Sequence, residues 1–273
     1  MYPVLGSIGP LHFYSYGLCL AVALGFSIYL FARDTGKYIA PDLGLTFHQG
    51  FQKAFDLGVV VILSSIVGAR IFYVLENYTE FQNGHWLDAI KVWEGGLVYY
   101  GGFFGAVAGA LVWVRHEKWP AVRCLDLVAP YILLGQAVGR VGCFLNGCCY
   151  GNVAEPHSGF LDWGHGWIFP GAPDDHPHLP TQLWELAGDL VLFFLLLLLR
   201  RWIMRFPGLS IALYGLLYGT LRLVIEFWRR DWNKHYLVIF NSASQAVSGI
   251  LIALSLLAIV WILFKANKGK SLA

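Results

Sequence analysis

The stretch PTQLWELAGDLVLFFLLLLL at residues 180–199 decides the fold, because it ends in ten consecutive apolar residues. A helix of about 20 residues is needed to cross the hydrocarbon core of a bilayer. The stretch has that length, so it predicts a transmembrane helix. Further apolar stretches have similar lengths, and together they predict seven spans at about 13–32, 54–75, 96–114, 125–146, 180–199, 208–227 and 238–264.

The composition of the whole chain agrees with this interpretation. Hydrophobic residues make up 57% of the 273 residues and charged residues only 13%, whereas a typical soluble domain has about 45–50% apolar and about 25% charged residues. So little charge excludes a soluble enzyme, a disordered chain and a nucleic-acid-binding protein. We predict an all-α, polytopic integral membrane protein that forms a single membrane domain over residues 1–273, has the lipid bilayer as its partner and binds no nucleic acid.

The distribution of basic residues predicts how the chain is oriented. Of the 19 Lys and Arg residues, twelve fall in the loops and tail on one side of the spans, four fall on the other side, and three lie within spans. Cytoplasmic loops are enriched in Lys and Arg. The N-terminus is therefore expected outside and the C-terminus in the cytoplasm. The two longest outward segments, 76–95 and 147–179, are expected to carry function, because loops of this length often do.

Three arginines lie inside apolar spans, where each costs about 2.5–3.5 kcal/mol on insertion scales. Arg222 has Glu226 four residues later on the same helical face, so one interpretation is a structural ion pair. Arg70 lies near the outer end of its span, where a long side chain can extend its charge to the interface. Arg140 has no acidic neighbour at helical spacing, which favours a functional role.

The same arginines point to an anionic ligand. Arg222 and Arg229 are seven residues apart and share a helical face, and Arg140 precedes the second outward loop. Guanidinium groups bind phosphate through paired hydrogen bonds and stay charged in a low dielectric. A phospholipid head group is the natural anion at that depth of the membrane. The arginines therefore predict a site for the phosphate of a phospholipid.

The segment Gly139–Gly151 has four glycines in thirteen residues. Glycine weakens a helix, so the segment predicts a broken helix end with backbone close to a ligand. The three cysteines of this segment have three open interpretations, namely a metal site, a disulfide on the oxidising side, and small buried side chains. We predict no metal, because the adjacent pair Cys148 and Cys149 lacks the usual Cys-x2-Cys spacing.

Two further segments enter spans from the outer side. In residues 93–102, the aromatic residues are interfacial anchors or, alternatively, place the Tyr100 hydroxyl in a lipid-facing cavity. The third span that follows contains a GxxxG pair, Gly105 and Gly109, which predicts close helix packing. Gln182 and Glu185 share a face just inside the fifth span. Glu185 is a candidate functional carboxylate or a partner for an arginine.

Taken together, these segments resemble the motifs of the prolipoprotein diacylglyceryl transferase family. The resemblance covers nearly the whole chain, in order. The matching elements are Tyr14–Gly17, Gly68–Tyr73, Glu94–Gly102, Gly139–Gly151, Pro180–Glu185 and Leu221–Arg229. The resemblance implies an enzyme of the bacterial cytoplasmic (inner) membrane with seven spans and an outward N-terminus.

The implied reaction transfers the diacylglyceryl group of phosphatidylglycerol to a cysteine thiol and releases glycerol phosphate. That cysteine lies in the lipobox of a prolipoprotein signal peptide, and no cofactor or metal is expected. By resemblance, Arg140 and Arg222 hold the lipid phosphate. The expected substrate-binding residues also include Tyr16, Asn146, Glu226, Arg229, Arg70, Gln182, Glu185 and Gly151.

The sequence departs from many family members at three positions. Tyr100 stands where many carry a His proposed as the base, Cys148 where some carry a Glu, and Cys143 where some carry an Asn. A phenol is a poor base at neutral pH. We therefore expect Tyr100 to act in catalysis by orienting the thiol or the lipid, and the identity of the base stays open.

The sequence also leaves two other hypotheses open. One is a transporter or channel, in which broken helices and intramembrane arginines line a pathway. The sequence has no inverted repeat of the kind that such proteins contain. The other is a non-catalytic lipid-binding or scaffold protein of the same fold, in which Tyr100 and Cys148 mark lost chemistry.

Overall fold

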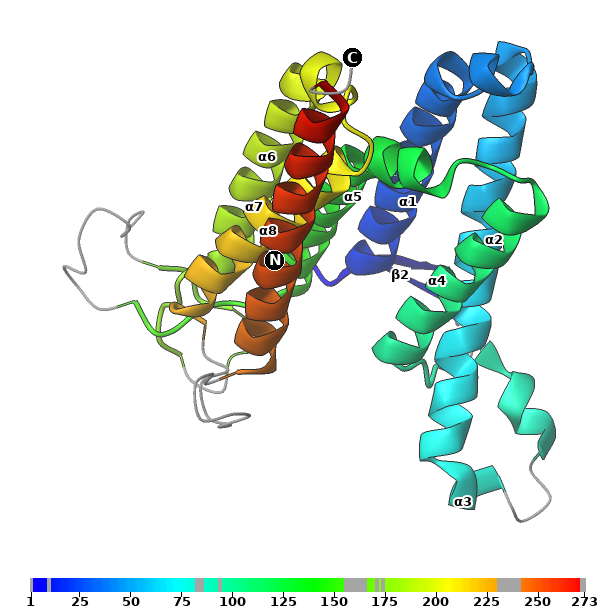
Figure 1. Cartoon of the computed structure of the whole chain (residues 1–273). Coiled ribbons are helices and arrows are strands. Elements are labelled where there is room, and N and C mark those ends of the chain that lie inside the picture. Colours follow the sequence, from blue (N-terminus) through cyan, green and yellow to red (C-terminus); the bar gives the residue numbers. More distant parts are fainter. Residues whose placement is uncertain are drawn as a thin grey trace. The chain divides into compact units, whose positions relative to one another are not determined.

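The computed structural model of the chain describes residues 2–8, 11–81, 86–92, 95–154, 166–169, 172, 175–229 and 242–270 (Figure 1). The elements in chain order are β1 (Val4–Ile8), β2 (Leu11–Tyr14), α1 (Ser15–Tyr38), η1 (Pro41–Leu43), α2 (Phe47–Glu76), α3 (Tyr78–Phe81), η2 (Trp86–Ile90), α4 (Tyr99–His116), α5 (Ala121–Asn146), α6 (Thr181–Ile203), α7 (Leu209–Glu226) and α8 (Ala243–Lys270). Helices dominate, as the composition predicts.

Six of the described helices are long and apolar enough to cross a membrane, namely α1, α2, α5, α6, α7 and α8. The protein is therefore an all-α, multi-pass membrane protein. The third predicted span, 96–114, forms helix α4, but its 18 residues include four glycines, two tyrosines, Arg115 and His116. These residues lower the apolarity of α4 below that of the other six, so its crossing of the bilayer stays a prediction.

Two details of the chain ends differ from the predicted spans. The N-terminal residues form an antiparallel hairpin, β1–β2, in which Val4 pairs with Tyr14 and Ile8 pairs with Leu11. Its strands have no regular alternation in the sequence, and no strand was predicted there. The last predicted span, 238–264, begins in residues 230–241, which lie outside the described part, and helix α8 begins at Ala243.

The chain divides into two compact units, Met1–Ser27 with Leu125–Ala273, and Ile28–Cys124. We call them the first and the second unit and describe each by itself. The interpretation as a single membrane domain stays a prediction.

In the second unit, helices α2 and α4 pack closely through glycine. A Cβ atom on Gly68 of α2 would collide with the carbonyl oxygen of Gly101 and lie 2.8 Å from the Cα of Gly105. A Cβ atom on Gly105 would collide with the carbonyl oxygen of Ser64, and one on Gly109 would collide with the Ser64 hydroxyl. The predicted close approach at the GxxxG pair is thus confirmed, with α2 as the partner helix.

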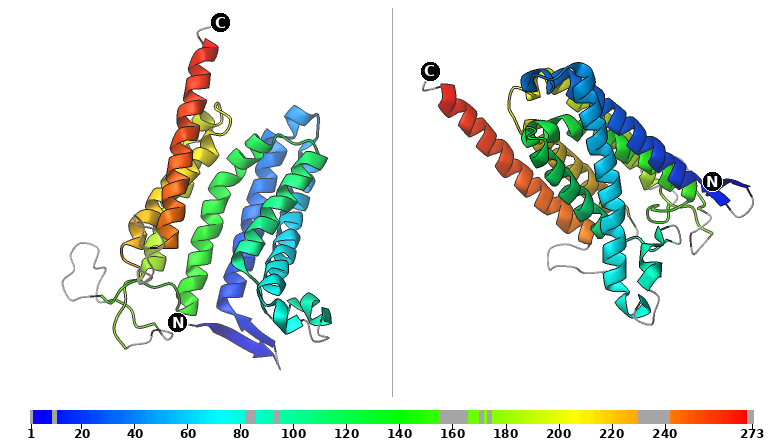
Figure 2. Two further views of the ribbon diagram at one scale, coloured as in Figure 1. Left: turned by 60° about the horizontal axis from the view of Figure 1, so that its bottom comes forward. Right: turned by 90° about the vertical axis from the view of Figure 1, so that its right-hand side faces the viewer.

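In the first unit, helix α7 packs against both α6 and α8 (Figures 1 and 2). Asp126 of α5 accepts hydrogen bonds from the backbone N–H groups of Gly208 and Ile211 at 2.6 and 3.1 Å. These donors belong to the start of α7, where a helix has free N–H groups, so a carboxylate of another helix caps it. The beginning of α7 is therefore fixed against α5.

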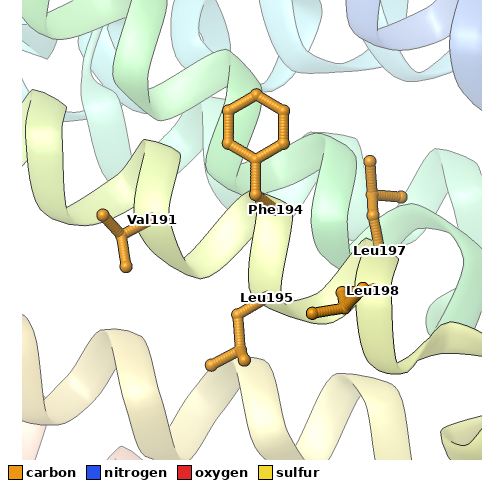
Figure 3. Close-up of a pocket in the computed structure, with 5 residues that line it drawn as sticks. All are labelled: Val191, Phe194, Leu195, Leu197 and Leu198. Atoms are coloured by element: carbon orange, nitrogen blue, oxygen red, sulfur yellow. The ribbon is translucent and has the colours of Figure 1, made fainter.

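The apolar run of α6 is partly exposed. Val191, Phe194, Leu195, Leu197 and Leu198 line a shallow pocket on this helix, and every lining residue is a hydrocarbon side chain (Figure 3). The side chains of Phe194 and Leu198 are 62% and 80% exposed. Such exposure of large apolar side chains suits contact with lipid. This pocket has no group that recognises a polar ligand.

The contact between α2 and α4 leads to a first prediction. The Gly105→Ala substitution places a methyl group against the Ser64 carbonyl, which is backbone and moves only if the helices separate. We expect a loss of about 1–3 kcal/mol in the free energy of unfolding, as for other overpacked sites, measured as a lower melting temperature in detergent.

Gly25→Ala in α1 is the matched control, because a Cβ atom there has no heavy atom within 4 Å. It should leave the melting temperature unchanged or raise it, since Ala favours helix over Gly. Equal melting temperatures of the two variants would show that the close approach does not contribute to stability.

Candidate functional site

Helices α5 and α6 of the first unit are joined by a buried ion pair. Nη2 of Arg140 binds Oε1 of Glu185, and the two side chains are 19% and 2% exposed. The sequence showed no acidic neighbour for Arg140 along its own helix, and its partner comes from α6 instead. A carboxylate at this position neutralises a guanidinium that is otherwise costly among apolar helices. Glu185 is therefore the partner of an arginine, one of its two predicted roles.

A second group of charges lies at the end of α7. Nη1 of Arg222 is 2.6 Å from Oε2 of Glu226, which confirms the ion pair predicted from their spacing. Nε of Arg229 is 3.8 Å from the same oxygen. Glu226 is 1% exposed, so one buried carboxylate lies between two guanidinium groups.

The start of α8 completes this group. The Ser242 hydroxyl donates to Oε1 of Glu226 at 2.7 Å, and it accepts a hydrogen bond from the backbone N–H of Gln245 at 3.1 Å. The Ser244 hydroxyl is 3.1 Å from Nη2 of Arg222. Neither serine was predicted as a site residue. Ser242 and Gln245 have the Ser-x-x-Gln spacing of a capping box, which is the signal that was missed.

Asp189 is a further buried carboxylate that the sequence reasoning missed. It lies one turn after Glu185 on α6 and is 0% exposed. Within the described residues, neither of its oxygens has a hydrogen-bond partner. The charges of Glu185, Arg140 and Arg222 act on it. The spacing of two acidic residues four apart in an apolar span would have identified the pair.

We call these six residues the charge cluster, and they are Arg140, Glu185, Asp189, Arg222, Glu226 and Arg229. They come from α5, α6, α7 and the residues that follow α7, all in the first unit. Tyr218 of α7 lies within the field of four of them. Guanidinium groups can bind an anion through paired hydrogen bonds, and the buried carboxylates hold three of them in this cluster.

The glycine-rich segment ends helix α5 beside the charge cluster. The helix continues to Asn146, and Gly147 then adopts a φ of 72°. The Cys148 N–H binds the carbonyl of Cys143 at 3.1 Å, and the Gly147 N–H binds that of Phe144 at 3.1 Å. This is a Schellman motif, in which a left-handed glycine closes the helix. The predicted broken helix end is thus confirmed.

Helix α6 holds the turn that follows α5. Nε2 of Gln182 donates to the carbonyl of Cys148 at 2.7 Å, and the Thr181 hydroxyl donates to that of Cys149 at 3.1 Å. Gly151 pairs with Arg229, and a Cβ atom on Gly151 would lie 2.5 Å from the carbonyl oxygen of Trp228. The close neighbour that requires glycine here is the backbone after α7, where the sequence suggested a ligand.

Tyr16 and Asn146 lie near the end of α5. A Cβ atom on Gly142 would be 3.2 Å from Cδ2 of Tyr16, and the charge of Arg140 acts on the Tyr16 phenol. The Asn146 side chain hydrogen-bonds Cys148. The first unit therefore brings together nine of the predicted site residues, which are Tyr16, Arg140, Asn146, Gly151, Gln182, Glu185, Arg222, Glu226 and Arg229.

Arg70 and Tyr100 belong to the second unit. The Arg70 guanidinium donates to the backbone carbonyls of Asp88, Ala89, Gly95 and Gly96 at 2.6 to 3.1 Å, and its side chain is buried rather than extended to an interface. It fixes the segment before α4. Tyr100 is 60% exposed. Trp93 and Glu94 of the predicted segment lie outside the described residues.

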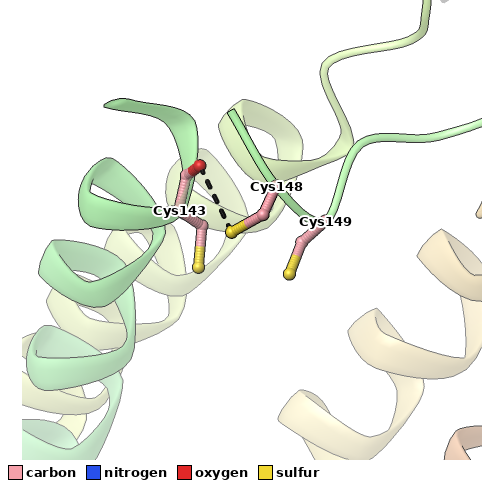
Figure 4. Close-up of side chains that lie close together, drawn as sticks. All are labelled: Cys143, Cys148 and Cys149. Atoms are coloured by element: carbon pink, nitrogen blue, oxygen red, sulfur yellow. Dashed lines mark hydrogen bonds between the residues drawn. The ribbon is translucent and has the colours of Figure 1, made fainter. Parts of the chain in front are cut away.

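The three cysteines of the glycine-rich segment meet in space. The Sγ atoms of Cys143, Cys148 and Cys149 lie within 4.8 Å of one another (Figure 4). All three thiols are free. The hydrogen bond with the Cys143 thiol and the positive charges of Arg229 and Arg140 lower the pKa of Cys149 to about 5, while burial raises the pKa of Cys148.

The fold and the charge cluster define a class, which is a helical multi-pass membrane protein with buried ion pairs among its helices. Comparison with known proteins gives the family. The family model described as prolipoprotein diacylglyceryl transferase matches residues 3–261, and the chain belongs to this family. The resemblance recognised in the sequence is thereby confirmed.

Individual relatives match over most of their length. The chain is 32% identical to a protein of Methylocella silvestris, over 94% of this chain and 90% of the relative. It is 32% identical to one of Cupriavidus metallidurans, over 97% and 94%, and 29% identical to one of Clostridium tetani, over 91% and 92%. All three relatives are named phosphatidylglycerol–prolipoprotein diacylglyceryl transferase.

The two acidic residues of α6 provide a matched prediction. Glu185→Gln leaves the buried Arg140 without its counter-charge, and breaking a buried pair costs up to about 3–5 kcal/mol. Asp189→Asn keeps the size of a side chain that forms no hydrogen bond with the described residues. We expect it to cost less than about 2 kcal/mol.

Thermal unfolding of both variants in the same detergent measures the difference. A lower melting temperature for Asp189→Asn than for Glu185→Gln would mean that Asp189, rather than the ion pair, holds the helices together.

Proposed function

We propose that the protein transfers the diacylglyceryl group of phosphatidylglycerol to the lipobox cysteine of prolipoproteins. The observation that carries this proposal is the charge cluster, with three guanidinium groups among buried carboxylates. The family and the names of the relatives specify the lipid and the protein substrate. The chain therefore acts as a transferase in the first step of lipoprotein maturation.

Arg140 is the arginine best disposed to receive the lipid phosphate. Within the described part of the chain, only its Nη2 donates a hydrogen bond to another residue, Glu185. Its Nε–H and Nη1–H groups are left for phosphate oxygens, and 19% of the side chain is exposed. A guanidinium presents these donors in a fixed plane that matches a phosphate. Arg140 is thus held in place by one anion and ready to bind another.

Arg222 and Arg229 provide the second side of the anion site. Glu226 contacts both guanidinium groups from the end of α7. At the start of α8, the Ser244 hydroxyl accepts a hydrogen bond from Arg222, and the Ser242 hydroxyl donates one to Glu226. Groups that are positioned before the reaction need no reorganisation as charge develops. The lipid phosphate lies between these arginines and Arg140 in the proposed complex.

The proposed reaction is a direct displacement. The thiol of the substrate cysteine loses its proton, and the thiolate attacks the glyceryl carbon that bears the phosphate ester. A C–S bond forms, the C–O bond to the phosphate breaks, and glycerol phosphate leaves with the electron pair and then takes up a proton. The arginines stabilise the charge that develops on the leaving phosphate. Their positive field also favours the thiolate form of the substrate cysteine.

The remaining assignments rest on the family pattern. Tyr16, Asn146, Gly151 and Gln182 line the site, and Tyr100 orients the thiol or the lipid. Arg70 contributes by fixing the segment that leads into α4. The protein lies in the bacterial cytoplasmic (inner) membrane, with α4 as a seventh span, the N-terminus outside and the C-terminus in the cytoplasm, as the distribution of basic residues supports.

The sharpest test replaces both members of the α5–α6 ion pair. Arg140→Ala alone would leave Glu185 as an uncompensated buried charge, so lost activity would be confounded with lost stability. The double variant Arg140→Gln with Glu185→Gln removes both charges and keeps two side chains that hydrogen-bond each other. We expect it to stay folded and to lose at least about 100-fold in rate, the effect of one preorganised donor.

The assay supplies vesicles of phosphatidylglycerol and a lipobox peptide and measures the mass gain of one diacylglyceryl group. The matched control is Lys53→Gln with Glu117→Gln, which removes an ion pair of the second unit with side chains 36% and 22% exposed. The control should keep the wild-type rate. Full activity of the Arg140–Glu185 variant would overturn the mechanism, and a wild-type protein that forms no covalent product would overturn the function.

A further inference from the structure

The proposed function gives no role to the protein's own cysteines, yet three of them form a compact group. Cys143 lies in the last turn of α5, and Cys148 and Cys149 lie in the turn after it (Figure 4). Their Sγ atoms are within 4.8 Å of one another. Three sulfur ligands around one ion, with metal–sulfur bonds of about 2.3 Å, are themselves about 4 Å apart. The group is therefore close to the size of a metal–thiolate site.

The backbone holds the three sulfur atoms together. The Schellman motif at Gly147 folds Cys148 back onto the carbonyl of Cys143. Cys149 has a φ of 65°, which is uncommon for a residue with a side chain, and its thiol lies near the other two (Figure 4). Gln182 and Thr181 hold the carbonyls of Cys148 and Cys149 from α6. Neighbouring cysteines that lack Cys-x2-Cys spacing thus become ligands through the fold of the turn.

The surroundings suit a negatively charged metal–thiolate group. The positive charge of Arg140 acts on Cys143 and Cys149, and the positive charge of Arg229 acts on Cys149. A monovalent ion and its three thiolates together have a net charge of −2, and these guanidinium groups offset it. Within the described residues, no fourth His, Cys or carboxylate ligand joins the group. Structural zinc sites almost always have four ligands, whereas thiolates alone suit Cu(I).

We propose that Cys143, Cys148 and Cys149 bind one thiophilic d10 metal ion through three thiolates, and that Cu(I) is preferred over Zn(II). The metal takes no part in the proposed transfer reaction, although the site shares the positive charges of Arg140 and Arg229 with the lipid phosphate. Binding replaces three S–H bonds by three metal–sulfur bonds and releases the thiol protons to solvent. The bound ion joins the end of α5 to the turn that α6 holds.

Titration of the purified, full-length protein tests the site directly. The protein is kept reduced in detergent, and Cu(I) is added in competition with a chromophoric Cu(I) chelator. We expect one Cu(I) per chain. Each of the variants Cys143→Ser, Cys148→Ser and Cys149→Ser should bind at least about 10–100-fold more weakly, since even the loss of a residue that supports a ligand has an effect of that size.

Cys19→Ser and Cys124→Ser are the matched controls, because these two cysteines lie outside the group. Both should bind Cu(I) like the wild type.

A second measurement needs no variant. Cu(I) should protect Cys143, Cys148 and Cys149 from alkylation in the folded wild-type protein, as mapped on peptides by mass spectrometry, and raise its melting temperature.

Several results would overturn the proposal. One is that the wild-type protein does not bind one Cu(I) per chain. Another is that the triple variant Cys143→Ser, Cys148→Ser, Cys149→Ser binds Cu(I) as the wild type does. A third is that Cu(I) does not slow the alkylation of the three cysteines. A parallel titration with Zn(II) tests the preference, and tight binding of Zn(II) without Cu(I) would show that the site takes a four-coordinate ion. Fewer than five alkylatable thiols in protein that is purified and denatured without reductant would show a stable disulfide in place of the ligands.

Discussion

The first unit depends on the neutralisation of charge among apolar helices. Arg140, Arg222 and Arg229 are each costly to place there, and each is accompanied by a buried carboxylate, Glu185 or Glu226. The pair of Arg140 and Glu185 joins α5 to α6, and the hydrogen bond from Ser242 to Glu226 joins the end of α7 to the start of α8. The same residues therefore define the fold of the unit and its candidate site, because the site consists of the charges that the fold must compensate.

This double role has a mechanistic implication. In the proposed complex, the lipid phosphate meets guanidinium groups that already have anionic partners, so it would compete with Glu185 and Glu226 for the same donors. The carboxylates keep the arginines oriented in the absence of lipid and share them when lipid is bound. Asp189, which makes no hydrogen bond with the described residues, adds a third carboxylate to this competition. The affinity of the site for lipid thus reflects a difference between two sets of ion pairs.

Local and periodic features were predictable from the sequence, and contacts between distant segments were not. Length and apolarity predicted the six spanning helices, and i, i+4 spacing predicted the pair of Arg222 and Glu226. The partner of Arg140 is 45 residues away on another helix, so no local pattern contains it. The spacing of Cys148 and Cys149 argued against a common site, yet a left-handed turn brings both to Cys143. Helix α4 is the predicted span that is not among the six, since its glycines serve packing against α2 at the expense of apolarity.

The contact of Gly151 with the backbone of Trp228 affects how loss of function at this position is to be understood. Because a methyl group on residue 151 would press on the chain just before Arg229, any side chain there shifts the backbone beside an arginine of the cluster. In a mutational scan, loss of activity at residue 151 therefore combines this mechanical effect with any loss of contact with the lipid. Intolerance to substitution at Gly151 reports in part on the geometry of a neighbouring arginine.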